Sequence, residues 1–247
     1  MNDAISSSDV TAFPTADSLC EECGYALRGL VSTGDCPECG KAIELSNPVH
    51  RQGLPWQRRA TFRNGFRTVK AIITSPRAAF DSMIVASPSG AAGTARFTAS
   101  HNRKERLFLF LIAMLAAAIY SYCVRIIGTH RDSDQIILAP IMLVILTYIE
   151  ALGVTYFSRK RGWRVPWRLA ERIVCYASIG WLPAMFVVPP LILLQGQTPF
   201  LPAWASWIPL RGELTDWLLI AVVGGVASLW FESLVWLGVR RLRYANG

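Results

Sequence analysis

The sequence predicts an all-α polytopic membrane bundle of four transmembrane helices, preceded by a small N-terminal zinc ribbon. Three observations predict this fold class. Hydrophobic residues fill 52% of the 247 positions, and residues 107–247 contain four long segments that are almost free of charge. Four of the six cysteines lie within twenty residues of one another. This composition excludes a soluble globular domain, a fibrous protein and a disulfide-rich secreted protein.

Residues 1–18 form a polar lead that we expect to be disordered. The lead contains three Asp but no Lys or Arg, and it lacks the apolar run of a secretory signal peptide. We therefore expect folded structure to begin at residue 19.

Residues 19–44 carry two C-x-x-C pairs with twelve residues between them. The four cysteines are Cys20, Cys23, Cys36 and Cys39. Each pair can turn two thiolates toward one metal ion, and two such turns complete a tetrahedral shell with bonds of ~2.3 Å. Gly24 and Gly40 follow the pairs, where a positive φ is often needed. The spacing predicts a structural Zn²⁺ site, because four thiolates leave no open position for a catalytic water.

Two disulfides, or a redox-active C-x-x-C pair, are the alternative interpretations of these cysteines. Disulfides need an oxidising compartment, whereas the topology derived below places this segment in the cytoplasm. A redox pair normally begins a helix within a βαβ unit, which a segment of this length cannot contain. The two remaining cysteines, Cys123 and Cys175, lie in apolar segments, where we expect them to be small packing residues.

The run CEECGYALRGL…CPECG resembles a short zinc ribbon found near the N-terminus of many bacterial proteins, several of them membrane proteins. The resemblance extends from Cys20 to about Ile43 and implies the same four cysteine ligands. It also implies a small apolar patch made by Leu27, Leu30 and Val31. The ribbon contains five acidic residues but only two basic ones, which disfavours nucleic acid as its partner.

Residues 45–106 form a connector that we expect to lie on the membrane surface. Within it, the sequence of residues 56–73 predicts one basic amphipathic helix. Its apolar side is formed by residues that recur at helical spacing, Phe62, Phe66, Val69 and Ile73. The interleaved basic residues are Arg59, Arg63, Arg67 and Lys70. Such a helix lies among the headgroups, and each Lys or Arg contributes ~1 kcal/mol of attraction to anionic lipid. Packing of this helix against the ribbon or the bundle is the alternative.

A second surface helix is predicted to begin at Ser75 and Pro76 and to run to about Val85. The motif SPRAAF at residues 75–80, together with the polytopic region that follows, resembles the Yip family. These membrane proteins are named for interaction with Ypt/Rab GTPases. The resemblance implies a membrane-organising or adaptor role.

The transmembrane domain is predicted over residues 107–239, and a hydrocarbon core of ~30 Å needs ~20 residues per helix. The predicted spans are residues 107–124, 136–157, 173–194 and 217–239. The loops and flanks on one side carry 13 Lys and Arg, and those on the other side carry 3. Because Lys and Arg stay cytoplasmic, we expect both termini, the ribbon and the tail 240–247 on the cytoplasmic side of a bacterial inner membrane.

A fifth span is the alternative topology, because residues 173–210 contain no charge. Pro199, Pro202 and Pro209 would break a second helix in this stretch, and residues 195–199 are polar. A fifth span would also place the basic tail on the outer side. The sequence therefore favours four spans.

Glu150 and Glu232 are the only charged residues inside the predicted spans. Each lies seven residues before the cytoplasmic end of its span, which places both at one level, ~10 Å deep at ~1.5 Å per residue. Two interpretations remain open. The two residues hold helices together as protonated or hydrogen-bonded groups, or they share a proton and respond to protons or cations.

No catalytic motif is present in the sequence, so we expect no enzyme activity. The three histidines are scattered, and neither a phosphate-binding glycine loop nor a nucleophile motif occurs. We expect a non-enzymatic integral membrane protein whose ribbon and basic helices form a cytoplasmic platform for an unidentified protein or for anionic lipid headgroups. The alternative is a small transporter or channel subunit that uses Glu150 and Glu232. Whether the chain forms a homo-oligomer is left open.

Overall fold

The computed structural model describes residues 13–85, 102–126, 134–183 and 213–246. Within these ranges the chain is mostly helical, with no β-strand and two isolated β-bridges. The chain separates into two compact units. The first unit consists of residues 1–104, 154–170 and 237–247, and the second of residues 105–153 and 171–236. The helical fold class is confirmed for the described residues.

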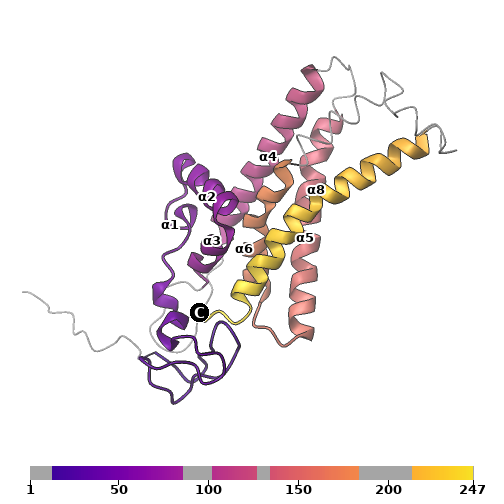
Figure 1. Ribbon diagram of the computed structural model, residues 1–247. Coiled ribbons are helices and arrows are strands. Elements are labelled where there is room, and N and C mark those ends of the chain that lie inside the picture. Colours follow the sequence, from indigo (N-terminus) through magenta and orange to yellow (C-terminus); the bar gives the residue numbers. More distant parts are fainter. Residues whose placement is uncertain (1–12, 86–101, 127–133, 184–212, 247) are drawn as a thin grey trace, which may run out of the picture. The chain divides into compact units, whose positions relative to one another are not determined.

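Short helices follow one another through the first unit (Figure 1). They are the 3-10 helices η1 (Ile43–Ser46) and η2 (Pro48–His50) and the α-helices α1 (Pro55–Arg58), α2 (Phe62–Thr74) and α3 (Pro76–Ser82). Three of these five helices begin with proline, at Pro48, Pro55 and Pro76. Proline suits this position because its fixed φ is already helical and its missing N–H has no helical partner there.

The single helix predicted over residues 56–73 is wrong, because the chain breaks between α1 and α2. Arg59 is extended, and the Thr61 hydroxyl then caps α2 by accepting a hydrogen bond from the Asn64 N–H. The break lets Trp56 fold back onto α2, where the Trp56 backbone N–H donates to the Thr68 hydroxyl at 3.0 Å. Gly65 lies inside α2, and a Cβ there would come within 3.2 Å of the Trp56 ring.

The second surface helix is also shorter than predicted, since α3 ends at Ser82 rather than near Val85. Beyond α3, the Ile84 N–H donates to the Gln57 side-chain oxygen at 3.1 Å. A contact with α1 thus replaces another turn of helix.

The ribbon has a small core of its own within the first unit. Its fully buried residues are Cys20, Leu27, Cys36 and Ile43. Leu30 is partly buried against this core. Val31 is 70% exposed, so the expectation that it belongs to the apolar patch is wrong. Ile43 takes its place.

Four further α-helices and one 3-10 helix follow in the described part of the chain. They are α4 (Asn102–Ile126), α5 (Asp134–Lys160), α6 (Trp167–Ala177), η3 (Ser178–Trp181) and α8 (Glu213–Leu242). Two of them contain segments long and apolar enough to cross a membrane, Asn102–Tyr122 and Pro140–Lys160. The third predicted span, residues 173–194, is described only as far as residue 183, and the stretch 195–210 of the fifth-span alternative lies outside the described residues.

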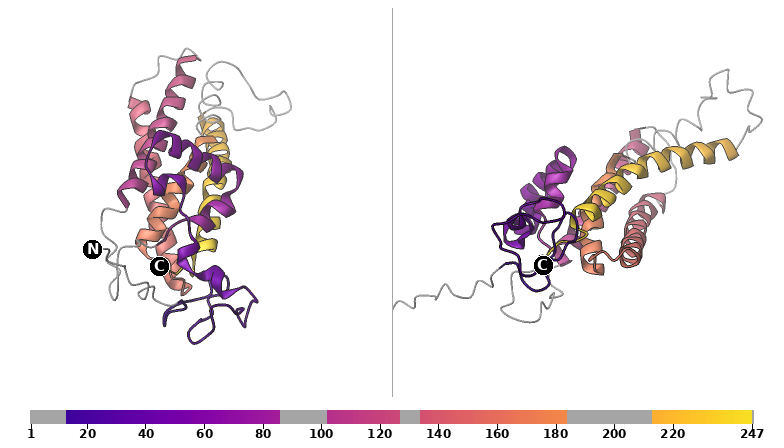
Figure 2. Two further views of the ribbon diagram at one scale, coloured as in Figure 1. Left: turned by 90° about the vertical axis from the view of Figure 1, so that its left-hand side faces the viewer. Right: turned by 60° about the horizontal axis from the view of Figure 1, so that its bottom comes forward.

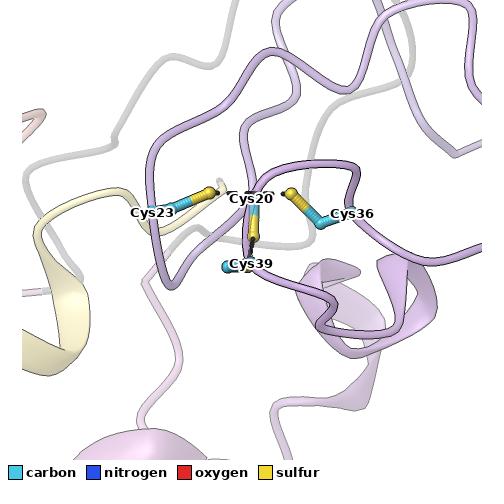
Figure 3. A group of neighbouring side chains, drawn as sticks. All are labelled: Cys20, Cys23, Cys36 and Cys39. Atoms are coloured by element: carbon cyan, nitrogen blue, oxygen red, sulfur yellow. Dashed lines mark hydrogen bonds between the residues drawn. The ribbon is translucent and has the colours of Figure 1, made fainter.

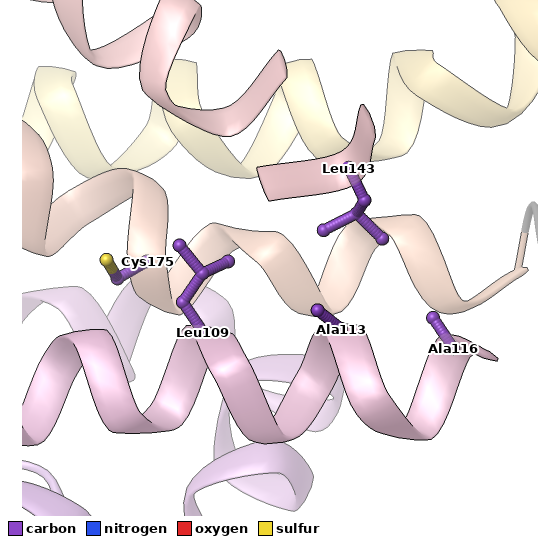
Figure 4. Packing of buried hydrophobic residues seen from close by; sticks show 5 residues of the cluster. All are labelled: Leu109, Ala113, Ala116, Leu143 and Cys175. Carbon is purple, nitrogen blue, oxygen red and sulfur yellow. The ribbon is translucent and has the colours of Figure 1, made fainter. Parts of the chain in front are cut away.

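Within the second unit, α4, α5 and α6 meet in an apolar cluster (Figure 4). Leu109, Ala113 and Ala116 form one face of α4, and Leu143 of α5 and Cys175 of α6 complete the cluster. The alanines let the neighbouring backbones approach closely, as small residues do in membrane helices. The role of Cys175 as a small packing residue is confirmed. The side chain of Cys123 lies outside the described part of the chain.

The opposite faces of α4 and α5 present large apolar side chains outward. Phe110 is 56% exposed, Ile149 56% and Leu152 60%. Only 39% of the apolar segment of α4 and 33% of that of α5 are buried by the rest of the chain. A core helix of a soluble protein would be mostly buried, whereas fewer than half of the residues in these two segments are buried.

Candidate metal centre

The four predicted cysteine ligands come together in the first unit, with their sulfur atoms turned toward one another (Figure 3). All four sulfur atoms lie within 4.8 Å of one another. The Sγ atoms of Cys20 and Cys39 are 3.5 Å apart, and those of Cys23 and Cys36 are 3.6 Å apart. A tetrahedral site with bonds of ~2.3 Å has sulfur–sulfur edges of ~3.8 Å. The cluster therefore has the size of a shell around one metal ion, and its thiols are free rather than disulfide-bonded.

Two nearly identical turns build this cluster, and we call residues 19–27 the first knuckle and residues 35–43 the second knuckle. In the first knuckle, the Cys20 N–H donates to the Tyr25 carbonyl and the Gly24 N–H donates to the Cys20 carbonyl, both at 2.8 Å. The second knuckle repeats both hydrogen bonds sixteen positions later, at 2.8 and 2.9 Å. The sequences LCEECGYAL and DCPECGKAI carry this repeat, a signal that the sequence analysis missed.

The predicted positive φ after each cysteine pair is confirmed. Gly24 has a φ of 84° and Gly40 a φ of 70°. Glycine adopts this left-handed conformation without the steric cost that a Cβ imposes. Each turn can therefore close without strain.

The surroundings of the thiols affect their ionisation in opposite directions. Burial opposes ionisation of Cys36, but backbone hydrogen bonds from Cys39 and Glu38, together with hydrogen bonds from the neighbouring thiols, outweigh burial and lower its pKa from 9.0 to about 7. Burial raises the pKa of the Cys23 thiol. Because metals bind the thiolate, Cys36 is the ligand prepared for binding at neutral pH, whereas Cys23 must release its proton to solvent as the metal binds.

The C-terminal tail (residues 243–246) covers the first knuckle within the same unit, and it follows the end of α8, drawn in yellow (Figures 1 and 2). The Asn246 amide donates to the carbonyls of Leu19 at 2.7 Å and Ser46 at 2.8 Å, and its oxygen accepts from the Leu19 N–H at 2.9 Å. The Tyr244 ring lies so close to Gly24 that a Cβ there would be 2.8 Å away. The tail leaves the second knuckle open, since residues 37–40 are all exposed.

A buried ion pair ties the ribbon to α3. The Arg51 guanidinium lies 2.7 Å from the Glu21 carboxylate, and both side chains are less than a tenth exposed. Arg51 also donates to the carbonyls of Asp81 and Met83 at 3.3 and 3.2 Å. Glu21, which follows Cys20, is therefore held by Arg51, and Arg51 in turn connects the ribbon to the end of α3.

The predicted membrane-surface residues lie on exposed parts of α2 and the turn before it. Arg59, Arg63, Arg67 and Lys70 are all exposed. Phe62 is 93% exposed and Phe66 67%, because α2 buries Thr68 and Ile72 against the unit instead. Both the basic and the aromatic sides of α2 are thus available to an outside partner.

The two glutamates of the predicted spans lie on α5 and α8 of the second unit. Glu150 is half-buried and Glu232 is exposed. In the described part of the chain neither carboxylate takes part in a hydrogen bond or an ion pair.

A second group of charges, which the sequence analysis missed, lies near the start of α4 and in the middle of α6. Glu105 faces Arg172 at 3.3 Å, and Arg106 faces Glu171 at 2.7 Å. The Tyr148 hydroxyl of α5 donates to the same Glu171 oxygen at 3.2 Å. Two Glu-Arg dipeptides, at 105–106 and 171–172, were the available signal, but both precede the predicted start of a span.

Comparisons of the chain with protein-family models, with curated proteins and with solved structures gave no match. Its function is therefore inferred from its own residues and geometry.

Proposed function

We propose that this chain is a non-enzymatic integral membrane protein of the bacterial inner membrane whose ribbon and basic helices form a cytoplasmic docking platform. The role is of the Yip-like membrane-organising or adaptor kind. The observation that carries the proposal is the uncovered apolar surface of α4 and α5, with only 39% and 33% of their apolar segments buried. In a folded chain, such a surface needs lipid or another apolar partner to cover it.

Four spans are proposed, with α4, α5 and α8 containing residues 107–124, 136–157 and 217–239. The third span, residues 173–194, begins within α6. The excess of Lys and Arg, 13 against 3, supports cytoplasmic termini.

Membrane topology is tested with epitopes placed before Asn2, after His130 and after Gly247, in right-side-out and inverted vesicles. Four spans predict that the two terminal epitopes are reached only in inverted vesicles and the one after His130 only in right-side-out vesicles. A C-terminal epitope on the outer side would establish the five-span alternative. Release of the chain by alkaline carbonate would overturn membrane integration.

Zinc is the metal that we propose for the four-thiol cluster. The sulfur–sulfur distances of 3.5 and 3.6 Å support a tetrahedral shell, and four thiolates would satisfy Zn²⁺ completely. In this role the ion holds the two knuckles together and performs no catalysis.

Metal content is the direct test of this assignment. We expect one zinc per chain in the wild type, a loss in Cys36→Ser, and no loss in the control Cys123→Ser. Cobalt substitution should give the absorption of a tetrahedral four-thiolate site. One iron per chain in place of zinc would contradict the assignment.

The second knuckle is the face that we propose for a protein partner. The tail already covers the first knuckle, whereas Pro37, Glu38 and Cys39 are exposed. Crosslinking mass spectrometry in native membranes tests this: crosslinks from Lys41 to a partner should disappear in Cys36→Ser and persist in Cys123→Ser. Equal crosslinking in both variants would exclude a folded ribbon as the docking element.

A further inference from the structure

A cavity of about 390 Å³ opens in the first unit between the ribbon, α3 and the end of α8. Its volume is that of a small-ligand site. Five of its lining side chains are Lys or Arg, and three are carboxylates. The lining therefore has a net positive charge before any pairing is considered.

Existing ion pairs account for two of these cations and two of the carboxylates. Arg51 is held by Glu21 at 2.7 Å, and Arg241 lies 3.7 Å from Asp81. Both pairs come from within the lining. They leave three cations and one carboxylate, Glu22, to determine what the cavity attracts.

The three remaining cations are Lys41 of the second knuckle, Arg77 of α3 and Arg240 of α8. Within the described residues, none of these three side chains takes part in a hydrogen bond or an ion pair. They come from three separate parts of the sequence, so the fold alone brings them to one cavity. Cations gathered in this way repel one another unless an anion lies between them.

We propose that this cavity binds a phosphate-bearing anion through Lys41, Arg77 and Arg240. Phosphate fits this donor set because guanidinium groups bind its oxygens in a bidentate manner and an ammonium adds a third charge-assisted contact. Glu22 is exposed, and its single negative charge does not cancel the three positive charges, so the unpaired groups keep a net positive charge.

Two sources can supply this chemistry. The first is the phosphate of an anionic lipid headgroup, because Arg240 directly follows the span proposed to end at residue 239. The second is a soluble phosphate compound. The lipid source depends on the proposed membrane function, whereas the soluble source does not, so failure of one can be distinguished from failure of the other.

The test uses the full chain in phosphatidylcholine nanodiscs, alone or with phosphatidic acid. Calorimetric titration with inorganic phosphate measures the soluble source, and native mass spectrometry of retained phosphatidic acid measures the lipid source. The variant Arg77→Gln/Arg240→Gln should weaken binding about tenfold or more, since it removes two charged hydrogen-bond donors. The control Arg28→Gln/Arg58→Gln removes the same charge from exposed positions outside the cavity and should bind like the wild type.

Saturable phosphate binding would establish a site for a soluble phosphate compound, and retention of phosphatidic acid without a phosphate response would establish a headgroup site. Absence of both phosphate binding and phosphatidic acid retention would overturn the proposal. Equal loss of binding in the control Arg28→Gln/Arg58→Gln would also overturn it. A second measurement needs no variant. Whichever ligand binds should protect Arg77 and Arg240 of the wild type from phenylglyoxal but leave Arg28 reactive, and equal modification at all three positions would overturn the proposal.

Discussion

The guanidinium of Arg172 lies 3.3 Å from the carboxylate of Glu105, and the two side chains are only 2% and 3% exposed. The neighbouring pair, Arg106 with Glu171 at 2.7 Å, runs in the opposite sense. The glutamate of each Glu-Arg dipeptide thus pairs with the arginine of the other dipeptide. Moving α4 by one residue along α6 would place like charges together, so the double pair fixes the register of these two helices.

Replacing Glu105 by Gln should destabilise the protein by about 3 kcal/mol, because it leaves the buried Arg172 without this carboxylate. Replacing Arg106 by Gln should cost less, since its side chain is 61% exposed and water screens its charge. Unfolding in mixed micelles measures both values. The exchange Glu105→Arg/Arg172→Glu tests the pairing itself, because it should recover part of the stability that the two single substitutions lose. Recovery of less than a tenth of the summed loss in unfolding free energy of Glu105→Arg and Arg172→Glu would contradict the pairing.

A substitution at Gly180 should separate η3 from α8. A Cβ on Gly180 would lie 2.5 Å from the Phe231 Cα and 2.7 Å from its backbone nitrogen, and backbone cannot move aside cheaply. Trp181 stacks on the Phe231 ring with centroids 4.6 Å apart, so the same shift would open this contact. We expect Gly180→Ala to cost about 1–3 kcal/mol in unfolding free energy.

The matched control for this substitution is Gly153→Ala in α5. Nothing lies within 4 Å of a Cβ at Gly153, so alanine should raise stability by up to about 1 kcal/mol through its better helix propensity. Equal effects of the two alanines would show that Gly180 does not limit the packing.

The covering of the first knuckle by the tail can be isolated by comparing two glycines that share a backbone conformation. Alanine at Gly40 should cost only the strain of positive φ, of order 1 kcal/mol, because nothing lies within 4 Å. Alanine at Gly24 should cost the same strain and also displace Tyr244. Hydrogen exchange at residues 244–246 should therefore accelerate in Gly24→Ala and remain unchanged in Gly40→Ala. Acceleration in both variants would mean that distortion of the four-thiol cluster, rather than loss of the Tyr244 contact, releases the tail.

Metal binding should weaken as the pH falls, and more steeply below about 7. Above this value Cys36 is already a thiolate, because backbone hydrogen bonds lower its pKa to about 7. Below it, a proton must also be displaced from Cys36, and each further displaced proton steepens the fall by about tenfold in affinity per pH unit. Competition with a chelator at pH 6, 7 and 8 measures the slope, and a constant slope through pH 7 would contradict this.

Local spacing is what made part of this structure predictable. The C-x-x-C pairs predict the thiol cluster because each turn involves only neighbouring residues, and the apolar stretches predict long helices for the same reason. The break between α1 and α2 was missed because the Thr61 hydroxyl competes locally with the helical pattern. Val31 was misassigned because Ile43, twelve residues later, fills the ribbon core instead.

Contacts between distant residues could not be predicted from spacing. Asn246 binds Leu19 across more than two hundred residues, and Arg77 and Arg240 reach one cavity from separate helices. No periodicity in the sequence relates these positions. The reciprocal Glu-Arg pairs left a visible repeat, but their partners become apparent only when α4 and α6 lie together.

The exposed aromatic residues of α2 should enter the headgroup region of an anionic bilayer. Phe62 and Phe66 are 93% and 67% exposed, and Arg63, Arg67 and Lys70 beside them can bind lipid phosphates. Amide exchange in α2 should therefore be slower in phosphatidylglycerol nanodiscs than in phosphatidylcholine nanodiscs. The variant Phe62→Ser/Phe66→Ser should lose this difference, whereas Val31→Ser/Val49→Ser, which removes apolar side chains 70% and 77% exposed elsewhere in the first unit, should keep it. Equal exchange of wild-type α2 in both lipids would exclude the interfacial position.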